Sequence, residues 1–175
     1  STVAIVSGKD VTLVDSNAMV LGASTVSGIL AVTAGGSVTQ SGTVTAGTLT
    51  ASLSSGALNL GTATNAISNL GAITAPGGFT LTNGNTSVTV GGTINTTTTG
   101  TVSISVGSGT YTQNNFDITS GSGNITITAD VVVVGTNTGN NAFQTSGTLT
   151  LKPSTATVAL SLAASTPATF DLTAA

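Results

Sequence analysis

The stretch VTLVDSNAMVLGASTVSGILAVTAGGSVTQSGTVTAGTLTA, residues 11–51, decides the fold of this chain. It contains three triplets in which an apolar residue, a small or polar residue and a second apolar residue alternate: Val11-Thr-Leu13, Leu30-Ala-Val32 and Leu49-Thr-Ala51. Such alternation places both apolar side chains on one face of a short β-strand. The triplets begin at positions 11, 30 and 49, so they recur every 19 residues. A recurrence of this length is typical of one coil of a solenoid.

Similar triplets continue along the rest of the chain. Their first residues lie at positions 58, 79, 102, 125, 149 and 170, separated by 21, 23, 23, 24 and 21 residues. The 19-residue spacing breaks between 49 and 58, which predicts a change of register there. Glycines punctuate the intervals, as at Gly35-Gly36 and Gly91-Gly92, and no helical period is sustained. We therefore expect no helix longer than a turn.

These periods predict an all-β, parallel β-helix (β-solenoid) that forms a single domain over residues 1–175. It would have about eight coils of roughly 19–24 residues, stacked ~4.8 Å apart into a rod roughly 40 Å long. An antiparallel sandwich is the main rival, but it usually has larger core residues and fewer glycines. The residues expected to point inward are Val11, Leu13, Leu30, Val32, Phe79, Leu81, Val102, Ile104, Ile125, Ile127, Leu149 and Leu151.

The composition excludes many function classes. The chain has 175 residues, two Lys or Arg, five Asp or Glu, no His and no Cys, with a formal net charge of −3. Most groups that transfer protons, act as nucleophiles or bind metals are absent, so we expect no enzyme activity, no metal and no cofactor. Lys9 and Lys152 are too few and too far apart to bind nucleic acid or anionic lipid. The sequence contains no run of 18 apolar residues, so it predicts no membrane-spanning helix.

The residues that carry a family resemblance are VTLVDSNAMVLGASTVSGILAVTAGGSVTQSG (11–42) and ALNLGTATNAISNLGAITAPGGFTLTNG (57–84). They resemble the repeats of large filamentous-haemagglutinin-like exoproteins, and SGTLTLKPSTATVAL (146–160) does so more loosely. That family comprises surface adhesins of Gram-negative bacteria, typically exported by two-partner secretion and folded as right-handed parallel β-helices. The resemblance implies a secreted, cell-surface location and a right-handed coil. It brings no catalytic residues, and the family's N-terminal secretion domain is not recognisable here.

Two kinds of carboxylate-based site are alternatives to a purely structural role. Calcium-binding nonapeptide repeats need a recurrent G-G-x-G-x-D, whereas Ser120-Gly-Ser-Gly123-Asn124 lacks the Asp, and Asp10 and Asp15 have no second pair. Polysaccharide-cleaving β-helix enzymes need clustered carboxylates, and the best pair available is Asp117 and Asp130, 13 residues apart. Their spacing differs from one coil, so we expect them not to stack and to serve no catalysis.

Recurrent Thr-x-Thr pairs suggest an ice-binding or carbohydrate-binding face. The pairs are Thr43/Thr45, Thr48/Thr50, Thr110/Thr112, Thr126/Thr128, Thr136/Thr138 and Thr148/Thr150. A binding face requires uninterrupted columns, and the unequal coil lengths argue against these. Thr43 and Thr48 are also too close together to lie in successive coils. The ordinary alternative is that Thr forms strands with its hydroxyl toward water.

Asparagines and aromatic residues allow further hypotheses. Turn asparagines such as Asn114-Asn115 and Asn140-Asn141 could form amide ladders between coils. The N-x-S/T sequences that would accept a glycan are those of Asn85, Asn95 and Asn124. The irregularly spaced aromatics are expected to fill the core or the corners rather than to stack on sugars or bases: Phe79, Phe116, Phe143 and Phe170.

The sequence thus predicts a non-enzymatic, extracellular structural or adhesive rod. It would be either the shaft of a giant surface adhesin or a processed subunit that polymerises end to end into a filament. The partners would be further copies or neighbouring repeats of the same chain, with host-cell or matrix glycans as candidate ligands. The ends carry no charged or helical cap, and Ala168–Ala175 still alternates, so open strand edges are expected to associate.

Overall fold

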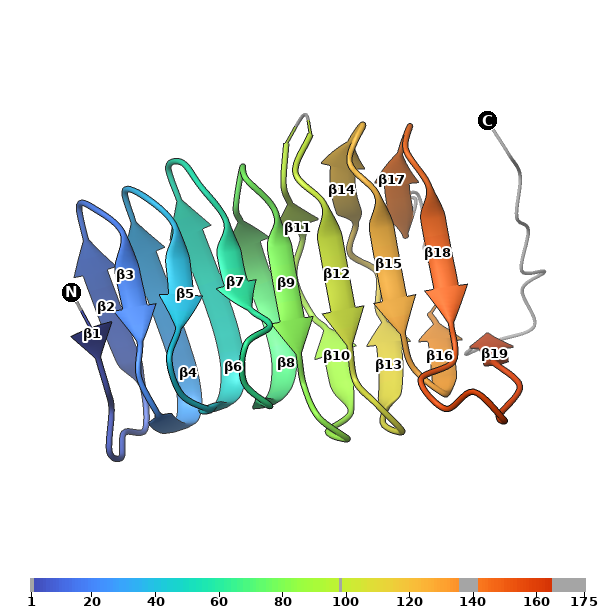
Figure 1. Ribbon diagram of the computed structural model, residues 1–175, viewed down its shortest axis with the longest axis horizontal. Coiled ribbons are helices and arrows are strands. Elements are labelled where there is room, and N and C mark those ends of the chain that lie inside the picture. Colours follow the sequence, from blue (N-terminus) through green and yellow to red (C-terminus); the bar gives the residue numbers. More distant parts are fainter. Residues whose placement is uncertain (1, 98, 136–141, 165–175) are drawn as a thin grey trace.

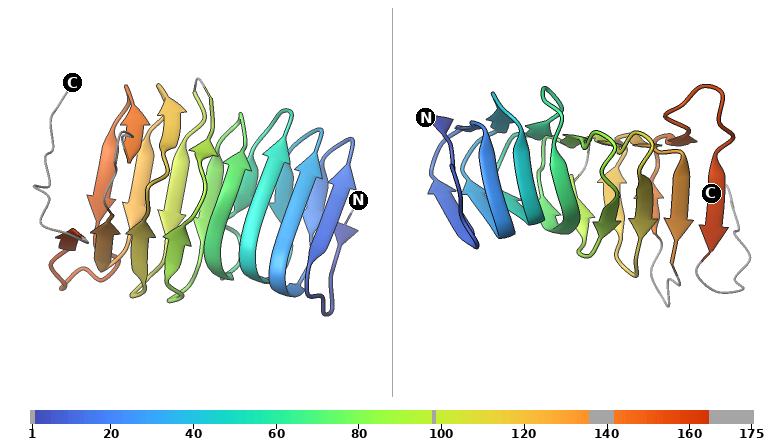
Figure 2. Two further views of the ribbon diagram at one scale, coloured as in Figure 1. Left: turned by 180° about the vertical axis from the view of Figure 1, so that it is seen from behind. Right: turned by 90° about the horizontal axis from the view of Figure 1, so that it is seen from below.

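A computed structural model describes residues 2–97, 99–135 and 142–164, which form two parallel β-sheets wound around one narrow core (Figure 1). The coils follow one another along the long axis, so the molecule is a rod (Figure 2). The described residues contain strands and turns but no helix, and so no helix that could cross a membrane. Every strand pair among them is parallel, which rules out the antiparallel sandwich and confirms the β-solenoid.

The first sheet contains eight strands, one from each coil. In spatial order they are β1 (Thr2–Val3), β3 (Met19–Leu21), β5 (Val38–Gln40), β7 (Leu58–Leu60), β9 (Phe79–Thr82), β12 (Val102–Ser105), β15 (Ile125–Thr128) and β18 (Leu149–Lys152). From the first of these strands to the last the chain makes about seven turns, in agreement with the expectation of about eight coils. The triplet at position 170 lies outside the described residues.

The second sheet contains eleven strands and forks halfway along the rod. Its undivided half consists of β2 (Val11–Asp15), β4 (Ser24–Ala34), β6 (Val44–Leu53) and β8 (Ala66–Thr74). One branch beyond β8 consists of β10 (Val88–Val90), β13 (Thr110–Gln113), β16 (Val131–Val134) and β19 (Ser161–Ala164). The other consists of β11 (Ile94–Asn95), β14 (Ile118–Gly121) and β17 (Phe143–Thr145).

The fork arises because two short strands follow β8 where one long strand preceded it. Leu70 of β8 pairs with Val90, and Ile73 pairs with Ile94. Between those pairs a Cβ on Gly92 would approach the backbone of Ala72 and Gly71 too closely, so only glycine fits there. Coils before the fork therefore have two strands, and coils after it have three.

Strand registers explain the break in the sequence period. Val11, Leu30, Leu49 and Leu70 form one column in the second sheet. A separate column in the first sheet contains Leu58, Phe79, Val102, Ile125 and Leu149. The change of register expected between positions 49 and 58 is a step from one sheet to the other, because the two series belong to different faces of the same coils.

The core lies between the sheets and contains most of the predicted inward residues together with others of the same columns. Eight of the twelve expected inward residues are buried: Leu30, Val32, Phe79, Leu81, Val102, Ile104, Ile125 and Ile127. The other four, Val11, Leu13, Leu149 and Leu151, are half-buried and pack against the core. They belong to β2 and β18, which lie at the two ends of the described stack and pair on one side only. The predicted inward register is confirmed.

Candidate functional site

Four aspartates of the described residues are spread along the rod, and each accepts hydrogen bonds from backbone or side-chain groups. Asp10 Oδ1 accepts the N–H of Ile29 at 2.9 Å, and Asp15 Oδ1 accepts that of Asn17 at 2.9 Å. Asp117 Oδ2 accepts a hydrogen bond from Gln144 Nε2 at 2.8 Å. Among the described residues no three acidic side chains gather as a metal site would require.

Asp130 holds a turn of the following coil. Its Oδ1 accepts the N–H groups of Ser154 and Thr155, each at 2.9 Å, and its Oδ2 accepts the Thr155 hydroxyl at 2.8 Å. The N–H and then the hydroxyl of Thr155, with a smaller contribution from Ser154, hold the pKa of Asp130 below its usual value. Asp117 precedes β14 and Asp130 precedes β16, so the two carboxylates lie in different branches of the second sheet.

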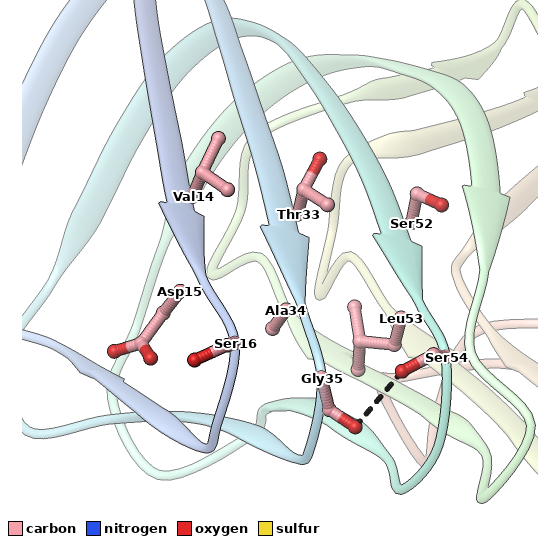
Figure 3. Close-up of a pocket in the computed structure, with 9 residues that line it drawn as sticks. All are labelled: Val14, Asp15, Ser16, Thr33, Ala34, Gly35, Ser52, Leu53 and Ser54. Atoms are coloured by element: carbon pink, nitrogen blue, oxygen red, sulfur yellow. Dashed lines mark hydrogen bonds between the residues drawn. The ribbon is translucent and has the colours of Figure 1, made fainter.

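A shallow concavity of about 450 Å³ lies where β2, β4 and β6 end (Figure 3). The outward side chains of Val14, Thr33 and Ser52 form one column along it. The Ser54 hydroxyl donates to the carbonyl oxygen of Gly35 at 3.0 Å across neighbouring coils. The concavity is lined by four hydroxyl side chains, the carboxylate of Asp15, Gly35 and the apolar residues Val14, Ala34 and Leu53.

Successive coils are joined by a recurring side-chain contact, here called the clasp. In each clasp, a polar side chain accepts the N–H of the residue that follows a glycine in the next coil. The five clasps are Asp10 with Ile29 after Gly28, Ser37 with Ala57 after Gly56, Asn85 with Ser108 after Gly107, Ser87 with Thr110 after Gly109, and Asn124 with Thr148 after Gly147. A Cβ on each of these glycines would overlap the residue that supplies the acceptor, so the glycine makes room for the bond.

Several amides lie inside the stack instead. Gln40 and Asn65 are only 6% and 2% exposed and bond to each other. Asn83 accepts the N–H of Ile67 and donates to its carbonyl oxygen, both at 2.8 Å. Asn114 and Asn115 are exposed, and Asn140-Asn141 lies outside the described residues, so the amide ladders at these positions stay a prediction. The amides therefore bond mainly to backbone groups of neighbouring coils.

Tyr111 and Gln113 form a second polar group in the core that the sequence did not predict. The Tyr111 hydroxyl donates to Gln113 Oε1, and Gln113 Nε2 donates to the carbonyl oxygen of Phe116. Burial raises the pKa of the Tyr111 hydroxyl well above its ordinary value. The Tyr111 ring stacks on that of Phe143, with centroids 6.4 Å apart.

The aromatic residues are only partly in the core. Phe79 is fully buried, and Phe143 is half-buried against the core. Phe116 is 39% exposed, so of the two expected places, core or corner, it does not occupy the core. It lies in the short connection between β13 and β14, where the chain leaves the sheet. Phe170 lies outside the described residues.

The outer face of the first sheet carries two columns of aligned polar side chains. One contains Thr80, Ser103, Thr126 and Thr150, and the other contains Thr82, Ser105, Thr128 and Lys152. These coils differ in length, but the connections absorb the difference and the strands stay in register. Unequal spacing was therefore a wrong reason to doubt such columns. Thr43 directly precedes β6 and Thr48 lies within it, so the two belong to the same coil, as expected. Thr136 and Thr138 lie outside the described residues.

Comparison with known proteins gives one partial match. A family model described as repeats of unknown function (DUF5649) matches residues 8–69, which contain β2 to β7 and part of β8. No curated protein and no solved structure matches the chain. The family match agrees with the coil period and the stacked registers. The chain is therefore a repeat protein with a parallel β-solenoid fold.

Proposed function

We propose that the chain is a structural and adhesive rod on the outside of a bacterial cell. The observation that carries this proposal is the continuous coil-to-coil register: backbone ladders and apolar columns run from coil to coil, and clasps join several neighbouring coils. Such an array lengthens by adding coils without any cofactor or disulfide, because each coil is held by its neighbours alone. The resemblance to filamentous-haemagglutinin-like repeats favours the same role.

The rod could serve as the shaft of a long adhesin or as a subunit of a filament. Strands β1 and β2 pair on one side only, and Val11 and Leu13 are half-buried. Their free edges offer N–H and C=O groups and apolar surface that a further coil would cover. That coil would come from the same polypeptide in the shaft version and from a second copy in the filament version. Sedimentation velocity over a wide concentration range distinguishes the two versions. A sedimentation coefficient that stays constant indicates the shaft, and one that rises steadily with concentration indicates the filament.

Load-bearing is the property that both versions share, and force spectroscopy tests it. The sequence has no cysteine, so single cysteines introduced at Thr2 and Lys152 would give two unique attachment points. We expect the rod to resist pulling along its axis and then to lengthen in steps of about one coil, as repeats are lost one at a time. Extension without a resisting force would contradict the structural role.

Adhesion is tested separately with beads that carry the chain. Coated beads should stay on glycan-coated or cell-coated surfaces under flow longer than beads coated with an unrelated β-protein of equal charge. Equal retention would remove the adhesive part of the proposal and leave the structural part, because the structural part rests on coil stacking alone.

A second candidate function is binding to ice or to a neutral polysaccharide through the first sheet. It is favoured by the two polar columns of Thr80 to Lys152, whose strands lie ~4.8 Å apart and whose alternate residues lie ~6.6 Å apart. The double variant Ser103→Lys/Thr126→Lys should abolish thermal hysteresis or polysaccharide binding. The matched control Thr89→Lys/Thr112→Lys changes the second sheet and should leave it intact. Absence of both activities in the unmodified chain would exclude this candidate.

A further inference from the structure

The three N-x-S/T sequences occupy different backbone settings. The sequence Asn85-Thr86-Ser87 lies entirely in the connection between β9 and β10. Asn95 belongs to β11, which pairs with β8 on one side and β14 on the other. The sequence Asn124-Ile125-Thr126 enters β15, where Ile125 is buried and both neighbouring strands are paired. Only the Asn85-Thr86-Ser87 segment can be lifted off the protein surface without breaking the strand pairs of a β-sheet.

The geometry of Asn85 leaves its amide nitrogen accessible. Asn85 and Ser87 are exposed, and the turn is closed by the N–H of Thr86, which donates to the carbonyl oxygen of Asn83 at 3.1 Å. Asn85 Oδ1 is engaged in its clasp with the N–H of Ser108 at 3.1 Å. In the part of the chain that the structure describes, Nδ2 makes no such bond. The oxygen of this amide therefore holds the next coil, while its nitrogen faces solvent.

We propose that Asn85 is the site at which the folded rod accepts an N-linked sugar from a donor that carries the sugar on a diphosphate. Transfer forms a bond between Asn85 Nδ2 and the anomeric carbon as the bond from that carbon to the diphosphate oxygen breaks. The diphosphate leaves with the electron pair, and Nδ2 gives up one of its two protons. This modification goes beyond the proposed rod function and does not depend on it.

The clasp explains why the fold tolerates this modification. A glycosylated asparagine is still an amide, so its carbonyl oxygen can still accept the N–H of Ser108. The Ser87 hydroxyl, two residues on, supplies the group that the N-x-S/T sequence requires. Ser87 Oγ accepts the N–H of Thr110 at 2.9 Å, which leaves its own hydrogen free to be donated. Both clasps of this turn therefore survive the attachment of a sugar.

The test compares the folded chain with peptides, using a soluble N-glycosyltransferase that modifies peptides of all three sequences with a nucleotide-activated hexose. On the folded chain we expect one hexose, located by fragmentation of the intact protein at Asn85, with Asn95 and Asn124 unmodified. Ser87→Ala should abolish the modification, whereas Ser87→Thr should preserve it. The thermal midpoint of the glycosylated chain should equal that of the unmodified chain.

A parallel reaction with a membrane oligosaccharyltransferase and a lipid-linked donor shows which source of activated sugar reaches the site. Modification of Asn85 by either donor supports the proposal. It is overturned if neither donor modifies Asn85 in the folded chain, if Asn95 or Asn124 reacts as fast there, or if Ser87→Ala is modified like the parent. Failure of any of these leaves the rod function untouched, because that function rests on coil stacking.

Discussion

Gln40 and Asn65 exchange two hydrogen bonds inside the rod: Gln40 Nε2 donates to Asn65 Oδ1 at 2.8 Å, and Asn65 Nδ2 donates to Gln40 Oε1 at 3.1 Å. Asn65 Oδ1 also accepts the N–H of Val44 at 2.9 Å, and Nδ2 donates to the carbonyl oxygen of Thr82 at 3.0 Å. One asparagine thus connects the coil before it and the coil after it. It does so where the chain turns into β8, the strand at which the second sheet forks.

Replacing Asn65 should therefore destabilise the rod strongly. Asn65→Leu leaves Gln40 Oε1 and the Val44 N–H buried without the partners that Asn65 supplies, at a cost of about 1–3 kcal/mol for each. Urea unfolding measures the loss. The double variant Gln40→Leu/Asn65→Leu should lose less than the sum of the two single variants, with a coupling of about 0.5–3 kcal/mol. Strictly additive losses would show that the pair does not act as a unit.

Shortening an apolar side chain of the core should lower the free energy of unfolding more in the middle of the stack than at its ends. Ile104 is fully buried between Leu81 and Ile127, so Ile104→Ala should lower the free energy of unfolding by about 2–5 kcal/mol. Leu151 is only half-buried, and Leu151→Ala should cost clearly less. Chemical denaturation checks both, with Val14→Ala, at an outward position 74% exposed, as the control that should change little.

Replacing a clasp glycine by alanine should destabilise the protein far more than replacing a glycine that has open space around it. Gly56 has a φ of +77°, and a Cβ there would overlap Ser37, so Gly56→Ala should cost about 1–3 kcal/mol. The nearest atom to a Cβ on Gly91 is 3.8 Å away, so Gly91→Ala should be neutral or slightly stabilising. Thermal unfolding of the two variants side by side decides this, and equal effects would argue against the clasp.

The apolar columns could be predicted because two periods in the sequence agree. Alternation of two residues fixes the face of each side chain, and recurrence at about one coil fixes its partner, so Leu30 over Val11 and Val102 over Phe79 follow directly. These periods do not show which triplet belongs to which sheet, because the strands of both sheets have the same triplet pattern. The fork was also missed, since it depends on the close packing of Gly92 against the preceding coil.

The buried polar groups were missed although their positions carry a signal. Gln40 ends the triplet Val38-Thr-Gln40 and lies in the inward column of Leu21. Gln113 ends Tyr111-Thr-Gln113 and lies in the inward column between Val90 and Val134. In both, a polar residue occupies a position that the alternation assigns to the core. Sequence composition alone cannot show which backbone groups such an amide will satisfy, because those come from neighbouring coils.

Acid should loosen the turn after β18, because Asp130 holds it only while ionised. Hydrogen bonds from Thr155 and Ser154 lower the pKa of Asp130 in the folded chain below its ordinary value of 3.8. A lowered pKa means that the stabilisation is present above the unfolded-state pKa and is lost as the pH falls through the folded-state pKa. The N–H groups of Ser154 and Thr155 should therefore exchange with deuterium slowly at neutral pH and progressively faster, relative to intrinsic rates, in acid.

The variant Asp130→Asn separates this effect from general acid unfolding. Its neutral amide oxygen accepts weaker hydrogen bonds, so exchange at Ser154 and Thr155 should already be fast at neutral pH and should lose its acid dependence. The matched control is Asp15→Asn, at the opposite end of the stack, where the carboxylate accepts the N–H of its own neighbour Asn17. That variant should leave the exchange of Ser154 and Thr155 unchanged. An unaltered acid profile in Asp130→Asn would show that another group controls the turn.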